Sequence, residues 1–185
     1  MQSMPFFGII AISATFVVTL GEIDLSFPSI VGITSLTFGL ILTATDGNFF
    51  IAFALASALG MFAGLINGLL VTKIGIPSIV ATIGTLYFWR GLVNVVSQGS
   101  GVAIVDVADG TWHHTLFVEK LFGLIPAQFI WFIVLTALMQ WVYRYHKFGN
   151  HIHFVGDNKD SSQMMGINVD NIKIIAFVQL GFFSS

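Results

Sequence analysis

The 185-residue sequence contains no cysteine and few charged residues, and each shortage restricts what the chain can be. Without cysteine, these residues form no disulfide, no thiolate metal site and no cysteine nucleophile. Charged residues make up 9% of the chain, whereas an ordinary soluble domain carries about 25%. So few charges do not cover a water-soluble surface. The formal net charge is -2 and no long basic run occurs, so a nucleic-acid partner is not expected.

Nucleotide-binding and catalytic signatures are also missing. The sequence has no phosphate-binding loop of the Gly-x4-Gly-Lys-Ser/Thr type, so we expect no ATP binding by this chain and no cofactor. No nucleophile with a neighbouring base and acid can be assembled, so an enzyme is not expected. The two histidine pairs, His113 with His114 and His151 with His153, lack further ligands, so the sequence predicts no metal site.

Apolar residues are abundant instead, at 56% of the chain with a mean hydropathy of +0.90. A membrane-spanning helix needs about 20 apolar residues. The sequence therefore predicts an all-α, polytopic transmembrane bundle forming a single domain over residues 1–185. We expect five complete spans and the start of a further one at 174: residues 4–20, 27–45, 49–71, 78–96 and 121–143.

The segment from 144 to 173 carries four of the seven cations and is predicted to be cytoplasmic, because positive residues concentrate on that side. Gly149 and Gly156 are expected to punctuate it as a loop. Asp157 or Asn158 can cap a helix of about two turns over 159–165. Two interpretations stay open for this short helix: a docking surface or an ordinary connection.

Small and polar residues inside the apolar runs suggest where helices meet. In the third run Ala52, Ala56, Gly60, Gly64 and Gly68 recur every four residues, so they line one helix face and favour close helix packing.

Ionisable residues near the membrane are the other candidates for function. Arg90 lies near the middle of the fourth run, where a charge is costly, so it should face protein, water or headgroups. Gly21, Glu22 and Asp24 interrupt two apolar runs. This interruption is either a surface turn or the unwound part of a discontinuous helix lining a cavity.

Four stretches of the sequence together resemble the permease subunit of the ribose/xylose-type family of bacterial ABC sugar importers. They match the family in order and spacing across nearly the whole chain: Gly21-Glu22-Ile23-Asp24-Leu25-Ser26, residues 64–71, residues 76–86 followed by Arg90-Gly91, and residues 148–169 with Val155-Gly156-Asp157-Asn158 and Gly166-Ile167-Asn168-Val169. The family's chains are longer, so this chain resembles an internal part truncated at both ends. It differs from the family's usual pattern at Glu22, near Pro28 and at Ser161 and Ser162.

The resemblance implies a sugar-translocating subunit of the bacterial inner membrane that works by alternating access. Its partners would be a cytoplasmic ATPase, a periplasmic sugar-binding protein and a second permease chain, which is either identical or different. The implied ATPase-coupling residues are Gly156, Asn158, Ser161, Ser162, Met165 and Gly166. Candidates for the sugar path are Asn67, Thr82, Thr85, Arg90 and Asn94. The alternatives are a secondary transporter, which needs an ion site at Glu22, Asp24 or Arg90, and a membrane scaffold or remnant that moves no solute.

Overall fold

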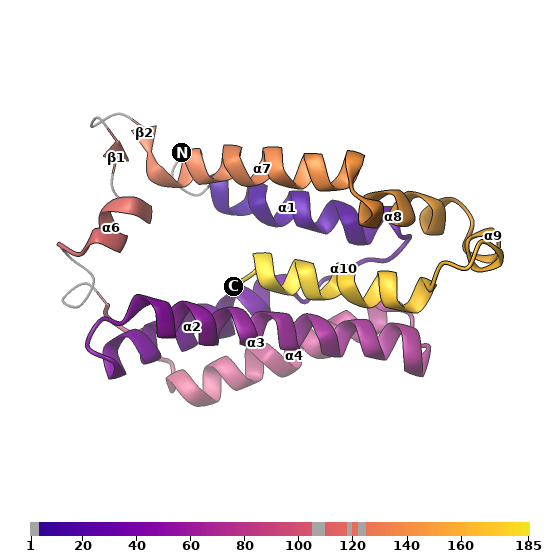
Figure 1. Ribbon diagram of the computed structural model, residues 1–185. Helices are drawn as coiled ribbons and strands as arrows, with labels where there is room; N and C mark the ends of the chain where they lie inside the picture. The colour runs from indigo at the N-terminus through magenta and orange to yellow at the C-terminus, as the bar shows by residue number, and fades with distance from the viewer. Residues whose placement is uncertain (1–3, 105–109, 118–119, 122–124) are drawn as a thin grey trace.

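The computed structural model describes residues 4–104, 110–117, 120–121 and 125–185, and nearly all of its regular structure is helical (Figure 1). The helices are α1 (Met4–Thr19), α2 (Phe27–Ala44), α3 (Phe49–Leu69), η1 (Leu70–Ile74), α4 (Ser78–Ser97), α6 (Trp112–Phe117), α7 (Ala127–Tyr145), α8 (Lys147–Asp157), α9 (Lys159–Met164) and α10 (Val169–Phe183). A strand pair of two residues each, β1 (Lys120–Leu121) with β2 (Ile125–Pro126), precedes α7. The all-α prediction is confirmed.

Helix α10 occupies the centre of the bundle. It lies between a layer formed by α1 and α7 and a layer formed by α2, α3 and α4 (Figure 1). The short helix α9 lies at one end of the molecule, and α6 with the strand pair lies at the other. The bundle therefore has two distinct ends, and the ends of the long helices point toward them.

Asparagine side chains cap the N-termini of three of the helices. Asn48 accepts a hydrogen bond from the backbone N–H of Ile51 at the start of α3. Asn158 and Asn168 begin α9 and α10 in the same way. Each cap satisfies a backbone donor that the first helical turn leaves unpaired. The predicted cap at Asn158 and the two-turn helix after it are thus present.

Among the described residues, three helical segments are long and apolar enough to cross a membrane: α2, α3 continued by η1 as 26 residues, and α4. Their bounds agree with the second, third and fourth predicted spans. The first predicted span corresponds to α1, which has 16 residues.

The fifth predicted span corresponds to α7, which is not one of these three segments. Helix α7 begins at Ala127, whereas the apolar run suggested a start at 121. Proline explains the difference: Pro126 disfavours helical conformation in the residue before it, and Lys120–Leu121 pairs with Ile125–Pro126 as strands. Residues 122–124 of the predicted span lie outside the described residues, as do residues 105–109 and 118–119 before it.

The prediction that Gly149 and Gly156 punctuate a loop is wrong, since both lie inside α8. Each packs against backbone. A Cβ atom on Gly149 would overlap the carbonyl of Tyr143, and one on Gly156 would overlap the carbonyl of Thr19 in α1. Here glycine permits close approach between chain segments and does not end a helix.

The small-residue face of α3 lies directly against α10. A Cβ atom on Gly60 would come within 2.5 Å of the carbonyl oxygen of Gly181, and one on Gly64 would overlap the carbonyl of Phe177. Gly68 faces the Cα atom of Ile174 at 2.9 Å from its own ideal Cβ position. The backbones of the two helices thus touch over about two turns, which is how helices associate where lipid supplies no hydrophobic drive.

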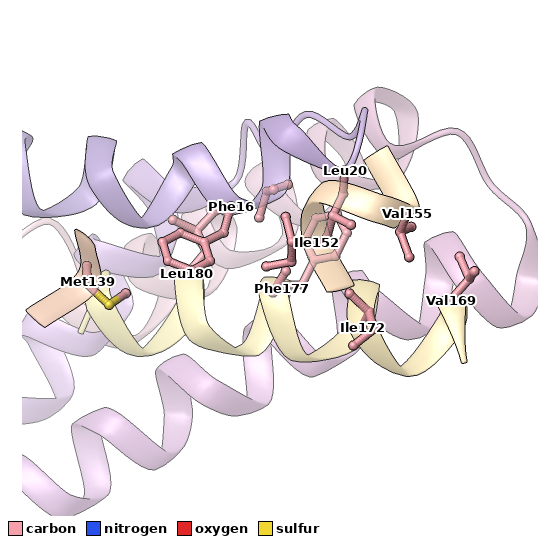
Figure 2. Packing of buried hydrophobic residues seen from close by; sticks show 11 residues of the cluster. Phe16, Leu20, Met139, Ile152, Val155, Val169, Ile172, Phe177 and Leu180 are labelled. Atoms are coloured by element: carbon pink, nitrogen blue, oxygen red, sulfur yellow. The ribbon is translucent and has the colours of Figure 1, made fainter. Parts of the chain in front are cut away.

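A cluster of buried apolar side chains packs α10 against the layer formed by α1 and α7 (Figure 2). The residues labelled in Figure 2 are Phe16, Leu20, Met139, Ile152, Val155, Val169, Ile172, Phe177 and Leu180. They come from α1, α7, α8, α10 and the residues flanking them. Many other large apolar side chains, including Phe53 of α3 and Val95 of α4, point outward. An apolar exterior of this kind suits a bilayer.

Gly64→Ala tests the contact between α3 and α10. We expect it to lower the free energy of unfolding in detergent by about 1–3 kcal/mol, because a methyl group is forced against backbone. Gly84→Ala in α4 is the matched control, since a Cβ atom there meets nothing within 4 Å. Denaturant titration measures both. Equal stability of the two variants would contradict the close contact.

Candidate functional site

Residues 21–26, between α1 and α2, form a linker without regular secondary structure, and its backbone is bonded to side chains of α4. Gly21 begins it with a φ of +76°, a conformation that glycine adopts without strain. The N–H of Ile23 donates to Ser78 Oγ at 3.1 Å, and the N–H of Leu25 donates to Thr82 Oγ1 at 3.2 Å. The hydroxyls of Ser78 and Thr82 thereby accept hydrogen bonds from backbone N–H groups that have no partner within a helix.

Residues of this linker alternate between two environments. Asp24 and Ser26 are buried and Glu22 is half-buried, whereas Ile23 and Leu25 are exposed. Successive side chains of an extended segment point to opposite sides, which produces this pattern. The polar residues face the protein and the apolar residues face outward. A strand at the surface of a soluble protein has its apolar side chains buried and its polar side chains exposed, which is the reverse. The arrangement here is consistent with a segment at membrane depth.

Asp24, Ser26, Asn67 and Thr85 form a buried polar cluster where the linker meets α3 and α4. Asp24 Oδ1 accepts from the N–H of Ser26 at 2.7 Å and from its hydroxyl at 2.6 Å. Asn67 Nδ2 donates to Asp24 Oδ2 at 3.1 Å and to Ser26 Oγ at 2.7 Å. Thr85 Oγ1 donates to Asn67 Oδ1 at 2.7 Å. Asn67 thus joins three parts of the chain.

The candidate path residues fall into two groups. Asn67, Thr82 and Thr85 are buried at the linker, and Thr82 donates to the carbonyl of Ser78 at 2.7 Å. Arg90 and Asn94, farther along α4, are exposed. The structure therefore does not bring all five residues together at one place.

Residues proposed for ATPase coupling lie at the end of the molecule formed by α9 (Figure 1). Ser161 supplies the N–H bonded by the Asn158 cap, and Ser162 is buried, with its hydroxyl donating to the carbonyl of Asn158 at 2.8 Å. Met164 and Met165 are 89% and 59% exposed. Gly166 follows with a φ of +82°, which ends the helix. The end of α9 thus presents two adjacent methionines to its surroundings.

The histidines have neighbours in ordinary packing contacts. His113 stacks on Phe49 at 5.1 Å between ring centroids, and His153 meets the ring of Tyr143 edge-on at 4.4 Å. Within the part of the chain that the structure describes, no group of three histidine, aspartate or glutamate side chains is arranged to hold a metal ion.

Sequence reasoning missed Ser26 and Ser78 as members of this site. The polar–apolar alternation of residues 22–26 is a signal that could have identified Ser26, because it predicts an extended segment with Glu22, Asp24 and Ser26 on one side. Ser78 has no comparable signal, since its role depends on where the linker lies against α4.

All of the chain, residues 1–185, matches the family described as "Branched-chain amino acid transport system / permease component". A match over the full length of the chain decides its family. The chain belongs to this permease family. The resemblance to an importer permease, drawn from the four stretches, is thereby confirmed, and the family is one of transport components.

Curated relatives of this permease include "Autoinducer 2 import system permease protein LsrC" of Yersinia pseudotuberculosis serotype O:3 (strain YPIII), which is 35% identical over 178 residues. The protein of the same name from Yersinia pestis (strain Pestoides F) is 33% identical over 177 residues. In both cases the alignment covers 96% of this chain and 49% of the relative. The chain thus spans about half the length of these relatives. No solved structure matches it.

Replacing Asn67 tests the buried polar cluster. We expect Asn67→Leu to lower the free energy of unfolding by about 2 kcal/mol, because it removes a donor to Asp24 Oδ2 and Ser26 Oγ and the acceptor of the Thr85 hydroxyl in a buried cluster. Asn94→Leu makes the same change at an exposed position of α4 and should alter stability by less than about 0.5 kcal/mol. Denaturant titration in detergent compares the two. A stable Asn67→Leu variant would show that the cluster contributes little.

Proposed function

We propose that this permease is a membrane-spanning part of an ATP-binding-cassette importer in the bacterial inner membrane, and that it moves a monosaccharide or related small polar solute inward by alternating access. The observation that carries the proposal is family membership over residues 1–185. The relatives named for autoinducer 2 import support an inward direction and a solute other than an amino acid.

The buried polar cluster has the chemistry that a hydroxyl-rich solute requires. The side chains of Asn67 and Thr85 in the cluster, and of Thr82 beside it, are an amide and two hydroxyls, which in this conformation bond to one another or to the linker. A sugar hydroxyl both donates and accepts, so it can replace such bonds without leaving a buried group unpaired. In the proposed cycle the solute passes these residues, with Arg90 and Asn94 lining the same route farther along α4.

Energy for transport comes, in this proposal, from a separate cytoplasmic ATPase subunit that docks on α9. The exposed methionines supply the apolar contact, because unbranched methionine side chains adapt well to a partner surface. Gly156, Asn158, Ser161 and Gly166 shape the segment, and Ser162 anchors it from its buried side. A periplasmic sugar-binding protein delivers the solute, and a second permease chain completes the route across the bilayer.

Capture of the ATPase tests this proposal most directly. We expect the cognate ATPase subunit to co-purify with the permease from detergent-solubilised membranes. Met164→Asp should reduce the captured amount about tenfold or more, because a charge is placed in an apolar contact. Met164→Leu is the matched control, since it preserves an apolar side chain, and it should retain capture within about twofold.

Two results would overturn the importer function. A correctly inserted parent that captures no ATPase and moves no solute would indicate a scaffold or remnant. Solute uptake that follows an ion gradient and needs no ATPase would indicate a secondary transporter. For that alternative, Glu22, Asp24 and Arg90 would have to supply the ion site.

A further inference from the structure

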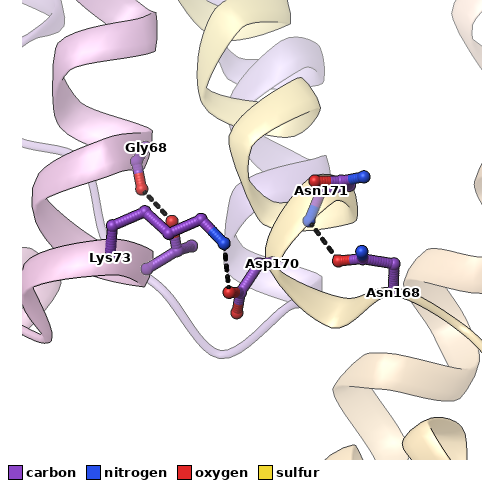
Figure 3. A network of polar contacts seen from close by, with 6 residues as sticks. Gly68, Lys73, Asn168, Asp170 and Asn171 are labelled. Carbon is purple, nitrogen blue, oxygen red and sulfur yellow. Dashed lines mark hydrogen bonds and ion pairs between the residues drawn. The ribbon is translucent and has the colours of Figure 1, made fainter.

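Glu22 of the linker and Lys173 of α10 form an ion pair that connects two regions of the site. Their side chains are only 14% and 15% exposed. A second ion pair, between Lys73 of η1 and Asp170 of α10, spans 2.8 Å but is 55% and 37% exposed (Figure 3). Exposed pairs contribute little, whereas removing one partner of a shielded pair leaves a charge without compensation. Glu22–Lys173 is therefore the stronger of the two connections.

Both residues of this pair stand next to functional segments. Lys173 lies in the first turns of α10, which begins three residues after Gly166 ends α9. Glu22 is two residues from Asp24, whose carboxylate holds the buried polar cluster together. The pair thus joins the helix that follows α9 to the linker.

A surface pocket beside the ion pair leaves room for movement at this point. Its volume is about 320 Å³, and its lining includes Glu22, Thr72, Pro77, Lys159 and Lys173. Because an open pocket lies on one side, packing does not lock the linker to α10 from that side. On that side, the linker is held to α10 by the ion pair between Glu22 and Lys173.

At its other side the linker is bonded to α4. The hydrogen bonds from Ile23 to Ser78 and from Leu25 to Thr82 fix its backbone to the first turns of that helix. A shift of α10 that pulls on Glu22 therefore acts on α4 and on the Asp24–Asn67 contact together. The connection from α9 to the cluster thus runs along the chain into α10, across the ion pair to Glu22, and along the linker to Asp24.

We propose that Glu22 and Lys173 are positioning residues whose ion pair transmits movement of α9 and α10 to the linker and the buried polar cluster. The inference rests on the proposed function, because it requires an ATPase that moves α9. It adds a specific contact through which ATP-driven movement reaches the solute path. Neither residue touches the solute.

The test uses the full-length permease, reconstituted in proteoliposomes with its ATPase and binding protein. Radiolabelled D-ribose, D-xylose and autoinducer 2 are the probes, and solute moved per ATP hydrolysed is the measurement. For Glu22→Gln and for Lys173→Gln we expect this ratio to fall about tenfold, while ATPase capture stays within about twofold of the parent. Exchanging the charges, Glu22→Lys with Lys173→Glu, should recover at least half of the parental ratio.

Lys73→Gln is the matched control, because it removes a lysine from the exposed ion pair to α10 and leaves the linker untouched. Its ratio should stay within about twofold of the parent. A parental ratio in Glu22→Gln would overturn the inference. So would a charge exchange that recovers nothing while all three variants lose thermal stability equally, since the pair would then serve folding alone. A parent that captures no ATPase overturns the proposed function, and this inference with it.

Discussion

One physical constraint governs this molecule: inside a bilayer, every backbone N–H and carbonyl group must find its partner within the protein. The helices meet that constraint by themselves, but the linker between α1 and α2 does not. It depends on hydroxyls of α4 and on the carboxylate of Asp24, which is held in turn by Asn67 of α3. The arrangement of α3 and α4 around the linker follows from this need.

The same constraint explains why α10 is central. Glycines on α3 permit contact between the two backbones, and apolar side chains on the other side of α10 meet α1 and α8. Helix α10 is thereby held on both sides, yet its first turns lie directly after α9 at the end of the bundle. A single helix connects the exposed methionines with the interior.

Local signals in the sequence predicted much of the fold, and tertiary contacts decided the rest. Apolar runs identified α2, α3 and α4 closely, and the predicted cap at Asn158 identified α9, because these signals depend on neighbouring residues. Helix α8 was missed because its two glycines suggest a loop until the backbone that each one meets is known. Within the site, Asn67 and Asp24 stood out as polar residues among apolar ones, but their mutual bond joins positions 43 residues apart. No local pattern encodes that pairing.

The glycine seam between α3 and α10 also limits where a solute can travel. Gly60, Gly64 and Gly68 leave no room for even a methyl group between the two backbones. A channel along that seam would have to separate the helices over their whole contact and expose carbonyl groups to the passing molecule. Under the proposed function, the solute route therefore lies on another face of α3, and the contact between α3 and α10 stays closed throughout the cycle.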